Sequence, residues 1–80
     1  MVDASAAAAE RVTALQAAHP DWRVWRSRSG AMWNATRRRY LSMQELYGGL
    51  ASTLLCEGPQ ELAQCLDEQA QRERVLVARW

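Results

Sequence analysis

Lysine, isoleucine and phenylalanine are missing from the 80-residue chain, so all ten of its basic residues are arginine. This bias, with alanine as the commonest residue, is typical of a GC-rich genome, and an arginine excess alone is therefore weak evidence for nucleic-acid binding. Long apolar runs are missing too, since none approaches the roughly 20 residues that cross a bilayer, and no signal-peptide pattern opens the chain. We therefore expect a cytoplasmic protein that does not bind membranes.

Residue types that carry catalysis are also sparse. The single histidine, His19, comes at the end of a predicted helix, where a cation favours the terminal carbonyls, and this role explains it better than catalysis. Cys56 and Cys65 lack the CxxC spacing of metal ligands, and we expect both to be reduced. No Ser/His/Asp or Cys/His arrangement stands out, and Gly48-Gly49 lacks the pattern of a phosphate loop. The sequence predicts no enzyme activity, no metal site and no cofactor.

The chain is short, so its own core is a weak source of stability. At this size a hydrophobic core supplies only about 3 to 5 kcal/mol unless something else supports the fold. No linker or internal repeat divides the sequence, and we expect one domain over residues 1–80 with an ordered core over about residues 4–74. A protein partner or a homodimer would add stability, and we expect one or the other.

Helices are predicted near both ends of the chain. The segment Ala4–Ala18 contains no glycine or proline and has apolar side chains at helical spacing, and Pro20 prevents its continuation. A second helix is predicted from Pro59, a residue that suits the first helical position. The core stripe of this second helix is Leu62, Cys65, Leu66 and Ala70. The tail Val75–Trp80 has no room for an independent element, so it either docks on the sheet or is available to a partner.

A β-hairpin is predicted between these helices, because the runs Trp22–Arg28 and Ala31–Arg38 flank Ser29-Gly30. With a loop of two or four residues, Arg26 faces Trp33, Val24 faces Ala35 and Trp22 faces Arg37, whereas a three-residue loop would invert the faces. The face predicted to be buried carries Trp22, Val24, Trp33 and Ala35. The opposite face carries Arg23, Trp25, Ser27, Met32, Asn34, Thr36 and Arg38.

The stretch Tyr40–Glu57 is ambiguous between helix and strand. We favour a helical turn over Ser42–Leu46, because Ser42 and Glu45 have the spacing of a capping box. A third strand is then expected over about Leu50–Cys56, with a helix there as the alternative. Together the elements predict an α+β fold: helix, three-stranded antiparallel sheet and helix in a two-layer sandwich. Both helices would cover one sheet face and leave the other open.

Part of the chain resembles short actinomycete proteins without an assigned role. The likeness spans about residues 10–70 and consists of Pro20-Asp21-Trp22, Val24, Gly30, Trp33, Ala35, Thr36 and Arg37, then Gly49-Leu50, Thr53-Leu54, Glu61-Leu62 and Leu66-Asp67-Glu68-Gln69. It implies a stand-alone αβββα domain and carries over no catalytic residue. The element order is also similar to that of double-stranded RNA-binding domains, which grip phosphates with lysines at the start of the last helix. This chain has Pro59-Gln60-Glu61-Leu62 there, a departure that argues against that mode of RNA binding.

The basic hairpin is the most suggestive feature of the sequence. Arginines beside an exposed tryptophan can pair with phosphates while an unpaired base stacks on the ring. A solvated strand face accounts for the same residues, with Arg26 over Trp33 as cation–π support within the fold. The candidate nucleic-acid residues are Arg23, Trp25, Arg28, Arg37, Arg38 and Arg39.

Protein interaction is the function that the sequence favours over nucleic-acid binding. Tryptophan and arginine anchor many protein interfaces, and the open sheet face would present both. The leading hypothesis is therefore a small non-catalytic interaction or regulatory module that docks this face on another protein or on a second copy. Its candidate partner-binding residues are Arg23, Trp25, Met32, Asn34 and Arg38. Trp80 is a further candidate, and an antitoxin-like subunit that binds the product of a neighbouring gene fits the same pattern.

Overall fold

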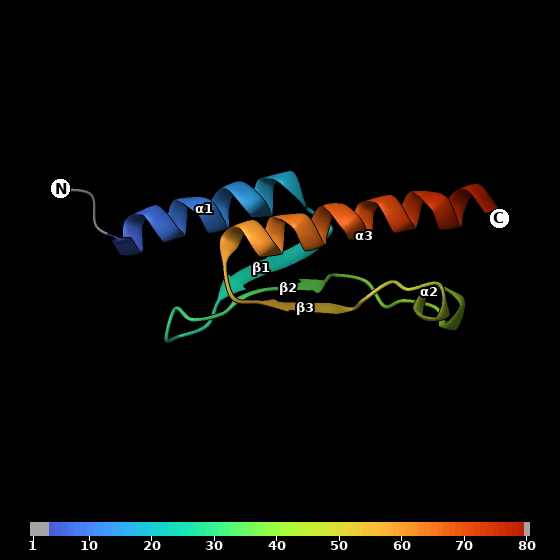
Figure 1. Ribbon diagram of the computed structural model, residues 1–80, viewed down its shortest axis with the longest axis horizontal. Helices are drawn as coiled ribbons and strands as arrows, with labels where there is room; N and C mark the ends of the chain where they lie inside the picture. The colour runs from blue at the N-terminus through green and yellow to red at the C-terminus, as the bar shows by residue number, and fades with distance from the viewer. Residues whose placement is uncertain (1–3, 80) are drawn as a thin grey trace.

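The computed structural model describes residues 4–79 and has the predicted α+β architecture. Helices α1 (Ala4–Ala18) and α3 (Pro59–Arg79) lie over one face of a three-stranded antiparallel sheet (Figure 1). The sheet consists of β1 (Trp22–Arg26), β2 (Trp33–Arg37) and β3 (Thr53–Cys56), with β2 in the centre. A short helix, α2 (Met43–Tyr47), follows β2 and lies beyond the end of the sheet (Figure 1).

Helix α1 has the bounds that the sequence predicts, and a glutamine fastens it to the neighbouring edge strand. The backbone amide of Val24 donates to Gln16 Oε1 at 3.0 Å, and Gln16 Nε2 donates to the carbonyl of Trp22. At the helix end the amide of His19 donates to the carbonyl of Leu15, and the amide of Trp22 donates to that of His19. This turn directs the chain from α1 into β1.

The hairpin has the predicted register. Trp22 pairs with Arg37, Val24 with Ala35 and Arg26 with Trp33. Regular strand structure ends at Arg26 and resumes at Trp33, so both strands are shorter than predicted. The amide of Ser27 still donates to the carbonyl of Met32 at 2.9 Å, and the register therefore corresponds to the four-residue loop. Gly30 has a φ of 79° within that loop, a conformation that glycine adopts at little cost.

The core lies between the sheet and the two long helices, as the face assignment predicts. All four residues of the predicted buried face are buried, and Leu62 and Leu66 of α3 are fully enclosed. Side chains of α1 and Cys65 pack against this cluster and remain partly exposed. Arg26 lies 5.1 Å from the ring centroid of Trp33, which confirms the predicted cation–π contact.

The ambiguous middle of the chain resolves into a helical turn followed by a strand. Ser42 caps α2, and both hydrogen bonds of the capping box with Glu45 are present. Strand β3 pairs with β2, so the strand interpretation of this segment is confirmed, although it starts at Thr53 rather than near Leu50. Leu50 is buried all the same, because the loop before β3 passes under α3.

Helix α3 corrects the prediction of a separate tail, since it continues through Val75 to Arg79. No glycine or proline follows Pro59 to interrupt it, and Gln, Glu, Arg, Ala and Leu, which favour helices, make up most of the segment. The helix therefore extends past the sheet and makes the molecule elongated, with extents of 51 × 19 × 18 Å. Trp80, a predicted partner residue, lies outside the described residues.

None of the helices formed by residues 4–79 is both long and apolar enough to cross a membrane.

Candidate interaction surfaces

The open sheet face is the surface on which the sequence placed its partner-binding residues. Neither α1 nor α3 covers it, because both lie on the opposite side of the sheet (Figure 1). The strand register places Trp25 beside Asn34 and Asn34 beside Leu55, in one row across the three strands. Leu55 is 67 % exposed and was not among the predicted residues. The third strand thus adds an apolar side chain that the hairpin sequence could not reveal.

Asn34 corrects one of the predicted contacts, because its side chain is not available on the surface. The residue is only 5 % exposed, although it lies on the open face. It sits on the central strand between Trp25 and Leu55, and larger neighbours on both sides shield a short side chain. Its Oδ1 is buried without a hydrogen-bond partner. Asn34 therefore lies beneath the surface side chains and is not itself available to contact a partner.

The remaining predicted residues of this face are at least partly accessible. Arg23 and Arg38 are exposed, and Trp25 and Met32 are half-buried. The guanidinium of Arg23 lies 5.7 Å from the ring centroid of Trp25, and the ring, which the sequence predicted to be exposed, is half-buried. Arg38 Nε donates to the carbonyl of Pro20 at 3.1 Å. Arg28 is exposed at the hairpin tip.

Arg37 corrects the nucleic-acid prediction, because its side chain points into the molecule. The side chain is 3 % exposed, and the guanidinium stacks 4.4 Å from the ring centroid of Trp22. It donates to the carbonyl of Ala51 at 2.9 Å, to Gln69 Oε1 at 3.0 Å and to Glu73 Oε1 at 2.7 Å. With these acceptors in place, Arg37 is a structural residue and cannot reach a phosphate.

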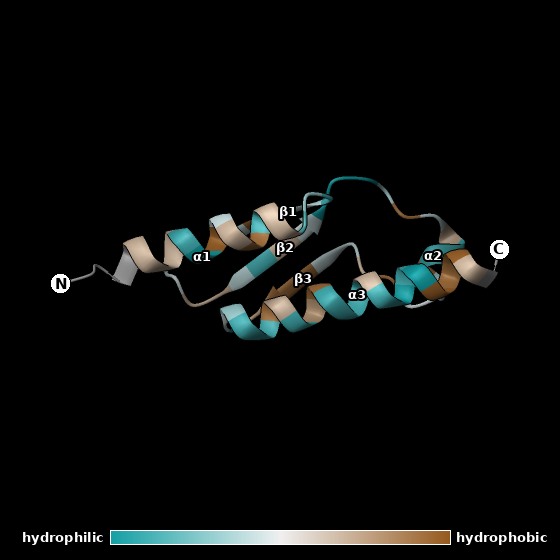
Figure 2. Cartoon of the chain, turned by 90° about the horizontal axis from the view of Figure 1, so that it is seen from above, coloured by the Kyte–Doolittle hydropathy of each residue, from teal (hydrophilic) through white to brown (hydrophobic). Residues whose placement is uncertain are grey.

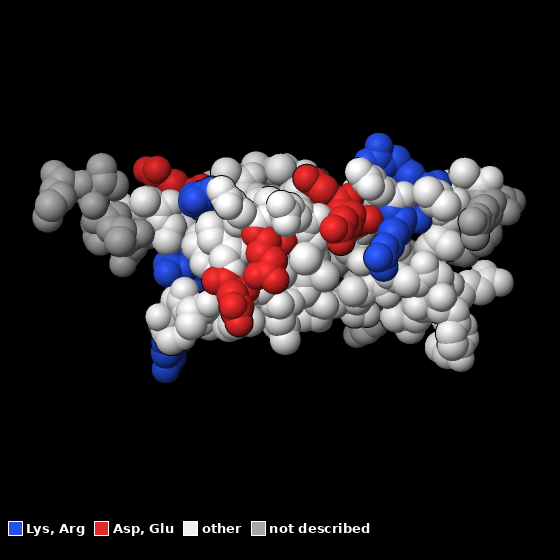
Figure 3. Space-filling view, viewed as in Figure 1, with Lys and Arg blue, Asp and Glu red and all other residues white. Residues whose placement is uncertain are grey.

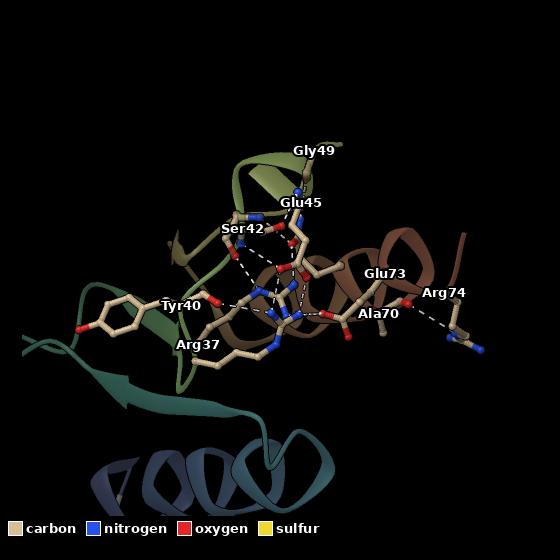
Figure 4. Close-up of polar contacts among 11 residues, drawn as sticks. Arg37, Tyr40, Ser42, Glu45, Gly49, Ala70, Glu73 and Arg74 are labelled. Carbon is tan, nitrogen blue, oxygen red and sulfur yellow. Dashed lines mark hydrogen bonds and ion pairs between the residues drawn. The ribbon is translucent and has the colours of Figure 1, made fainter. Parts of the chain in front are cut away.

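Arg39 is likewise engaged within the fold. Its guanidinium donates to both carboxylate oxygens of Glu45, at 3.0 and 2.6 Å, and to Glu73 Oε1 at 3.1 Å. Figure 4 shows Arg37, Glu45 and Glu73 converging between α2 and α3. We call the group Arg37, Arg39, Glu45, Gln69 and Glu73 the polar junction. The polar junction joins the end of β2 to α2 and α3. Because Arg37 and Arg39 are engaged in it, the candidate nucleic-acid residues that remain are Arg23, Trp25, Arg28 and Arg38.

The polar junction shifts the protonation of Glu45. Hydrogen bonding from Arg39, and then from the backbone amide of Ser42, lowers the pKa of Glu45 from 4.5 to about 2. The same contact with Glu45 raises the pKa of Arg39 above its usual value. Both charges are therefore maintained over the ordinary pH range, and the link between α2 and the rest of the fold remains ionic.

We expect the stability that Glu45 provides to be complete above pH 4.5 and to decline as the pH falls toward 2. The reason is linkage, because a carboxyl with a lowered pKa in the folded state must be protonated at the cost of its native contacts. In thermal melts across that range, the difference between wild type and Glu45→Gln should shrink as the pH falls. Arg39→Gln should flatten the profile in the same way, and parallel profiles for wild type and Glu45→Gln would contradict the assignment.

Gln69 and Glu73 are the contacts that sequence reasoning missed. They follow the core stripe of α3 by helical spacing, with Gln69 three residues after Leu66. Gln69 is buried, and its Oε1 also accepts from the amide of Ala51 at 2.8 Å. A polar residue at a position of the apolar stripe was the available signal. Only the tertiary structure shows that the loop before β3 supplies the matching donor.

Exposed apolar side chains also lie at the end of the molecule where α2 meets the last turns of α3, with Val75 and Val77 on opposite sides of α3. Figure 2 shows hydrophobic colouring at the last turns of α3, next to α2. We call the exposed large apolar residues of this region the apolar end: Tyr40, Met43, Leu46, Tyr47, Val75 and Val77. Tyr40 is 100 % and Tyr47 83 % exposed, and the ring of Tyr40 points away from the polar junction (Figure 4). No local sequence pattern groups these residues, because they come from separate segments of the chain.

The two cysteines are free, in agreement with the prediction that they are reduced. Burial, followed by contact with Cys65, raises the pKa of Cys56 to about 11. Its thiol therefore stays protonated and weakly nucleophilic at neutral pH. Within residues 4–79 no three His, Cys, Asp or Glu side chains lie close enough to hold a metal ion.

The start of α3 is unsuited to the phosphate contact of double-stranded RNA-binding domains. The amide of Glu57 donates to Glu61 Oε2 at 3.0 Å, so a carboxylate of the chain itself lies at the helix start. Acidic side chains gather over the first half of α3, whereas its second half carries Arg72 and Arg74 with Glu73 between them (Figure 3). A negatively charged ligand would be repelled at this end of the helix.

Comparison of the chain with protein-family models, curated proteins and solved structures found no match.

Proposed function

We propose that the protein is a small non-catalytic interaction module of the cytoplasm that binds a protein partner through its open sheet face. The observation that supports this proposal most directly is the row formed by Trp25, Asn34 and Leu55, because neither long helix covers it. Leu55 offers an exposed aliphatic side chain and Trp25 a partly exposed ring, and aromatic side chains anchor many interfaces. The free thiols fit a reducing compartment.

Charge on the same face specifies the chemistry of the partner. Arg23 and Arg38 are exposed there, and no acidic residue belongs to β1, β2 or β3. A partner with an apolar centre and acidic residues at its rim would complement this arrangement, and rim charges speed association more than they strengthen it. The partner we propose is therefore an acidic protein segment.

Nucleic-acid binding is the second candidate, and the contact between Arg23 and Trp25 supports it. Single-strand binders combine phosphate-pairing cations with rings on which bases stack. Arg23, Arg28 and Arg38 are the exposed arginines of the hairpin region. If all three contact phosphates, the slope of log K against log salt for a single strand should be about −2.

The experiment compares two probes, a displayed library of random peptides and a mixed single-stranded oligonucleotide. Selected peptides should carry an apolar residue flanked by acids, and their affinity should fall at least about 30-fold with Trp25→Ala or Leu55→Ser. Tyr47→Ser serves as the matched control, since Tyr47 is an exposed apolar residue away from the sheet. Circular dichroism verifies that each variant is folded.

The outcomes separate the two candidates. Peptide binding that tolerates salt and requires Leu55 supports the protein-interaction module. Oligonucleotide binding that falls steeply with salt and is lost in Arg23→Gln and Arg38→Gln supports nucleic-acid binding instead. Ligands that bind equally well to all of these variants would overturn both proposals for the sheet face.

A further inference from the structure

The two edges of the sheet differ in how their backbone groups are paired. Strand β2 lies in the centre, so β1 and β3 each have one side without a neighbouring strand. On the β1 side, the amide of Val24 donates to Gln16, and the carbonyl of Trp22 accepts from Gln16. The amide of Trp22 donates to the carbonyl of His19. Helix α1 and the turn after it therefore occupy much of the β1 edge.

The edge of β3 is free by contrast. The amide of Arg37 donates to the carbonyl of Ser52 at 2.9 Å, and hydrogen-bonded pairs recur at every second residue of an antiparallel ladder. In the observed register, Thr53 and Leu55 therefore direct their N–H and C=O groups away from β2. Among residues 4–79 these outward groups have no hydrogen-bond partner.

The sequence of β3 gives this edge little protection. Natural edge strands avoid pairing with other chains through charged side chains, proline, bulges or short length. Strand β3 contains no charged residue and no proline, and it pairs with β2 without a register shift. Thr53 and Leu55 are both exposed, so another strand can reach their backbone. The strand has only four residues, which limits an added strand to a similar length.

Helix α3 closes both ends of this edge and leaves the middle open. At one end the amide of Glu57 donates to Glu61 Oε2 at 3.0 Å. At the other end the amide of Ala51 donates to Gln69 Oε1 at 2.8 Å. The free groups of β3 lie between these two contacts, so the contacts define where an added strand begins and ends.

The side of α3 that borders this edge carries more acidic than basic residues. Cys65 contacts the last residue of β3. By helical spacing, Glu61, Glu68 and Arg72 lie on the same side of the helix as Cys65. The guanidinium of Arg72 donates to the carbonyl of Gly49 at 3.1 Å, before β3 begins. The two glutamates are therefore the charges of α3 nearest to the free edge, and they favour basic side chains on an added strand.

These charges favour a segment of another protein over a second copy of this chain. If two copies joined their β3 edges into one antiparallel sheet, Glu61 and Glu68 of one α3 would face those of the other, and like charges repel. An added strand from another protein alternates its side chains between the two sides of the sheet. One set lies beside Leu55 on the open face, and the other set lies against the acidic side of α3.

We propose that the partner adds a fourth strand to the sheet along β3, with apolar side chains toward the open face and basic side chains toward α3. Main-chain hydrogen bonds to Thr53 and Leu55 would anchor this strand, as in other cases of strand addition. The inference rests on the proposed function, because the strand belongs to the partner that covers Leu55 and Trp25. Acidic residues that complement Arg23 and Arg38 would come from the part of the partner that crosses the open face.

The first test is amide hydrogen exchange of the full chain, measured by NMR. The two probes are the peptides selected from the displayed library and a short peptide of alternating valine and arginine. At saturation, the amides of Thr53 and Leu55 should exchange at least about 10-fold more slowly than in the free protein. The amide of Arg26 is the matched control, since it points outward on the β1 edge and should change little.

The second test removes one outward N–H group. Thr53→Pro should weaken peptide binding at least about 10-fold relative to Thr53→Ala, which keeps the amide. Proline is tolerated at the first residue of an edge strand when the missing N–H faces solvent, and Thr53 has this position in β3. The exchange measurement on wild type gives an answer even if Thr53→Pro does not fold.

The third test concerns charge. Glu68→Arg should weaken binding of the valine–arginine peptide about 3-fold or more at low salt. Asp67→Arg makes the same change of charge on the side of α3 that faces His19, and it should have a smaller effect. Equal losses in the two variants would contradict the placement of the basic side chains.

The outcomes distinguish the added strand from the sheet-face proposal. Peptide binding that requires Trp25 and Leu55 side chains but leaves the amides of Thr53 and Leu55 unprotected would overturn the added strand alone. Protection of these amides that persists in Trp25→Ala would support the added strand and count against the sheet face. If both amides are protected in a peptide-free dimer, the edge belongs to a second copy and the inference is wrong. Failure of both probes to bind would overturn both proposals.

Discussion

Replacement of Arg37 by methionine should remove most of the stability of the fold. The guanidinium donates to Ala51, Gln69 and Glu73 from a side chain that is 3 % exposed. Breaking a buried hydrogen-bonded ion pair by removing one partner costs about 3 to 5 kcal/mol, and methionine keeps the packing against Trp22 while it abolishes every donor. Since a domain of this size has only about 3 to 5 kcal/mol to lose, we expect the variant to be largely unfolded at room temperature.

Urea unfolding followed by circular dichroism measures this effect, with Arg38→Met as the matched control. Arg38 is the next residue in the chain and is exposed, with one hydrogen bond from Nε to the carbonyl of Pro20. Its replacement should change the free energy of unfolding by less than about 0.5 kcal/mol. Equal unfolding midpoints for the two variants would show that the polar junction contributes little to stability.

Leu66→Ala should strongly destabilise the fold. Leu66 is one of two fully buried leucines, and it packs in the cluster that also contains Trp22 and Trp33. Truncating a buried leucine removes its transfer free energy and leaves a cavity, at a cost of about 2 to 5 kcal/mol. The variant should retain helical signal at low temperature only in the presence of a stabilising osmolyte, because little net stability would remain.

Asp67→Ala is the control for this variant, since Asp67 is the next residue on the same helix and is exposed. Its carboxylate is 72 % exposed and lies 3.9 Å from Nε2 of His19, and a contact of that length to an exposed carboxylate contributes little. We expect thermal melts to show a large decrease in the midpoint for Leu66→Ala and almost none for Asp67→Ala. Similar decreases in both variants would mean that α3 is stabilised by its surface rather than by its core.

Arg37 and the core leucines stabilise different halves of α3. The first half of α3 is stabilised by apolar burial against the sheet, through Leu62 and Leu66. The second half contacts the fold through polar groups, with Gln69 and Glu73 bonded to Arg37. Loss of Arg37 should therefore destabilise the fold by removing these polar contacts, and loss of Leu66 should destabilise it by leaving a cavity in the core.

The open sheet face illustrates the limit of reasoning from strand alternation. Parity correctly separated Trp22, Val24, Trp33 and Ala35 from the opposite face, because a hairpin register of known parity determines which side chains share a face. Parity alone did not reveal that Asn34 would be shielded, or that Leu55 would become its neighbour. Both facts depend on the third strand, which pairs with β2 from a distant part of the chain.

The sequence by itself determined the local structure of this protein. The bounds of α1, the capping box of α2, the start of α3 at Pro59 and the hairpin register all depend on residues close together in the chain, and all four predictions are confirmed. Helix capping, proline geometry and side-chain alternation act over a few residues, so their signals can be read locally.

Only the tertiary structure decided which arginines are available and where apolar surface accumulates. Arg37 and Arg39 look like their exposed neighbours in the sequence, yet their partners Glu45, Gln69 and Glu73 come from α2 and α3. The apolar end likewise combines residues from α2 and the far end of α3, which are more than twenty positions apart. Ion pairs and apolar patches depend on distance in space, and that distance is fixed by how the helices pack on the sheet rather than by any local pattern.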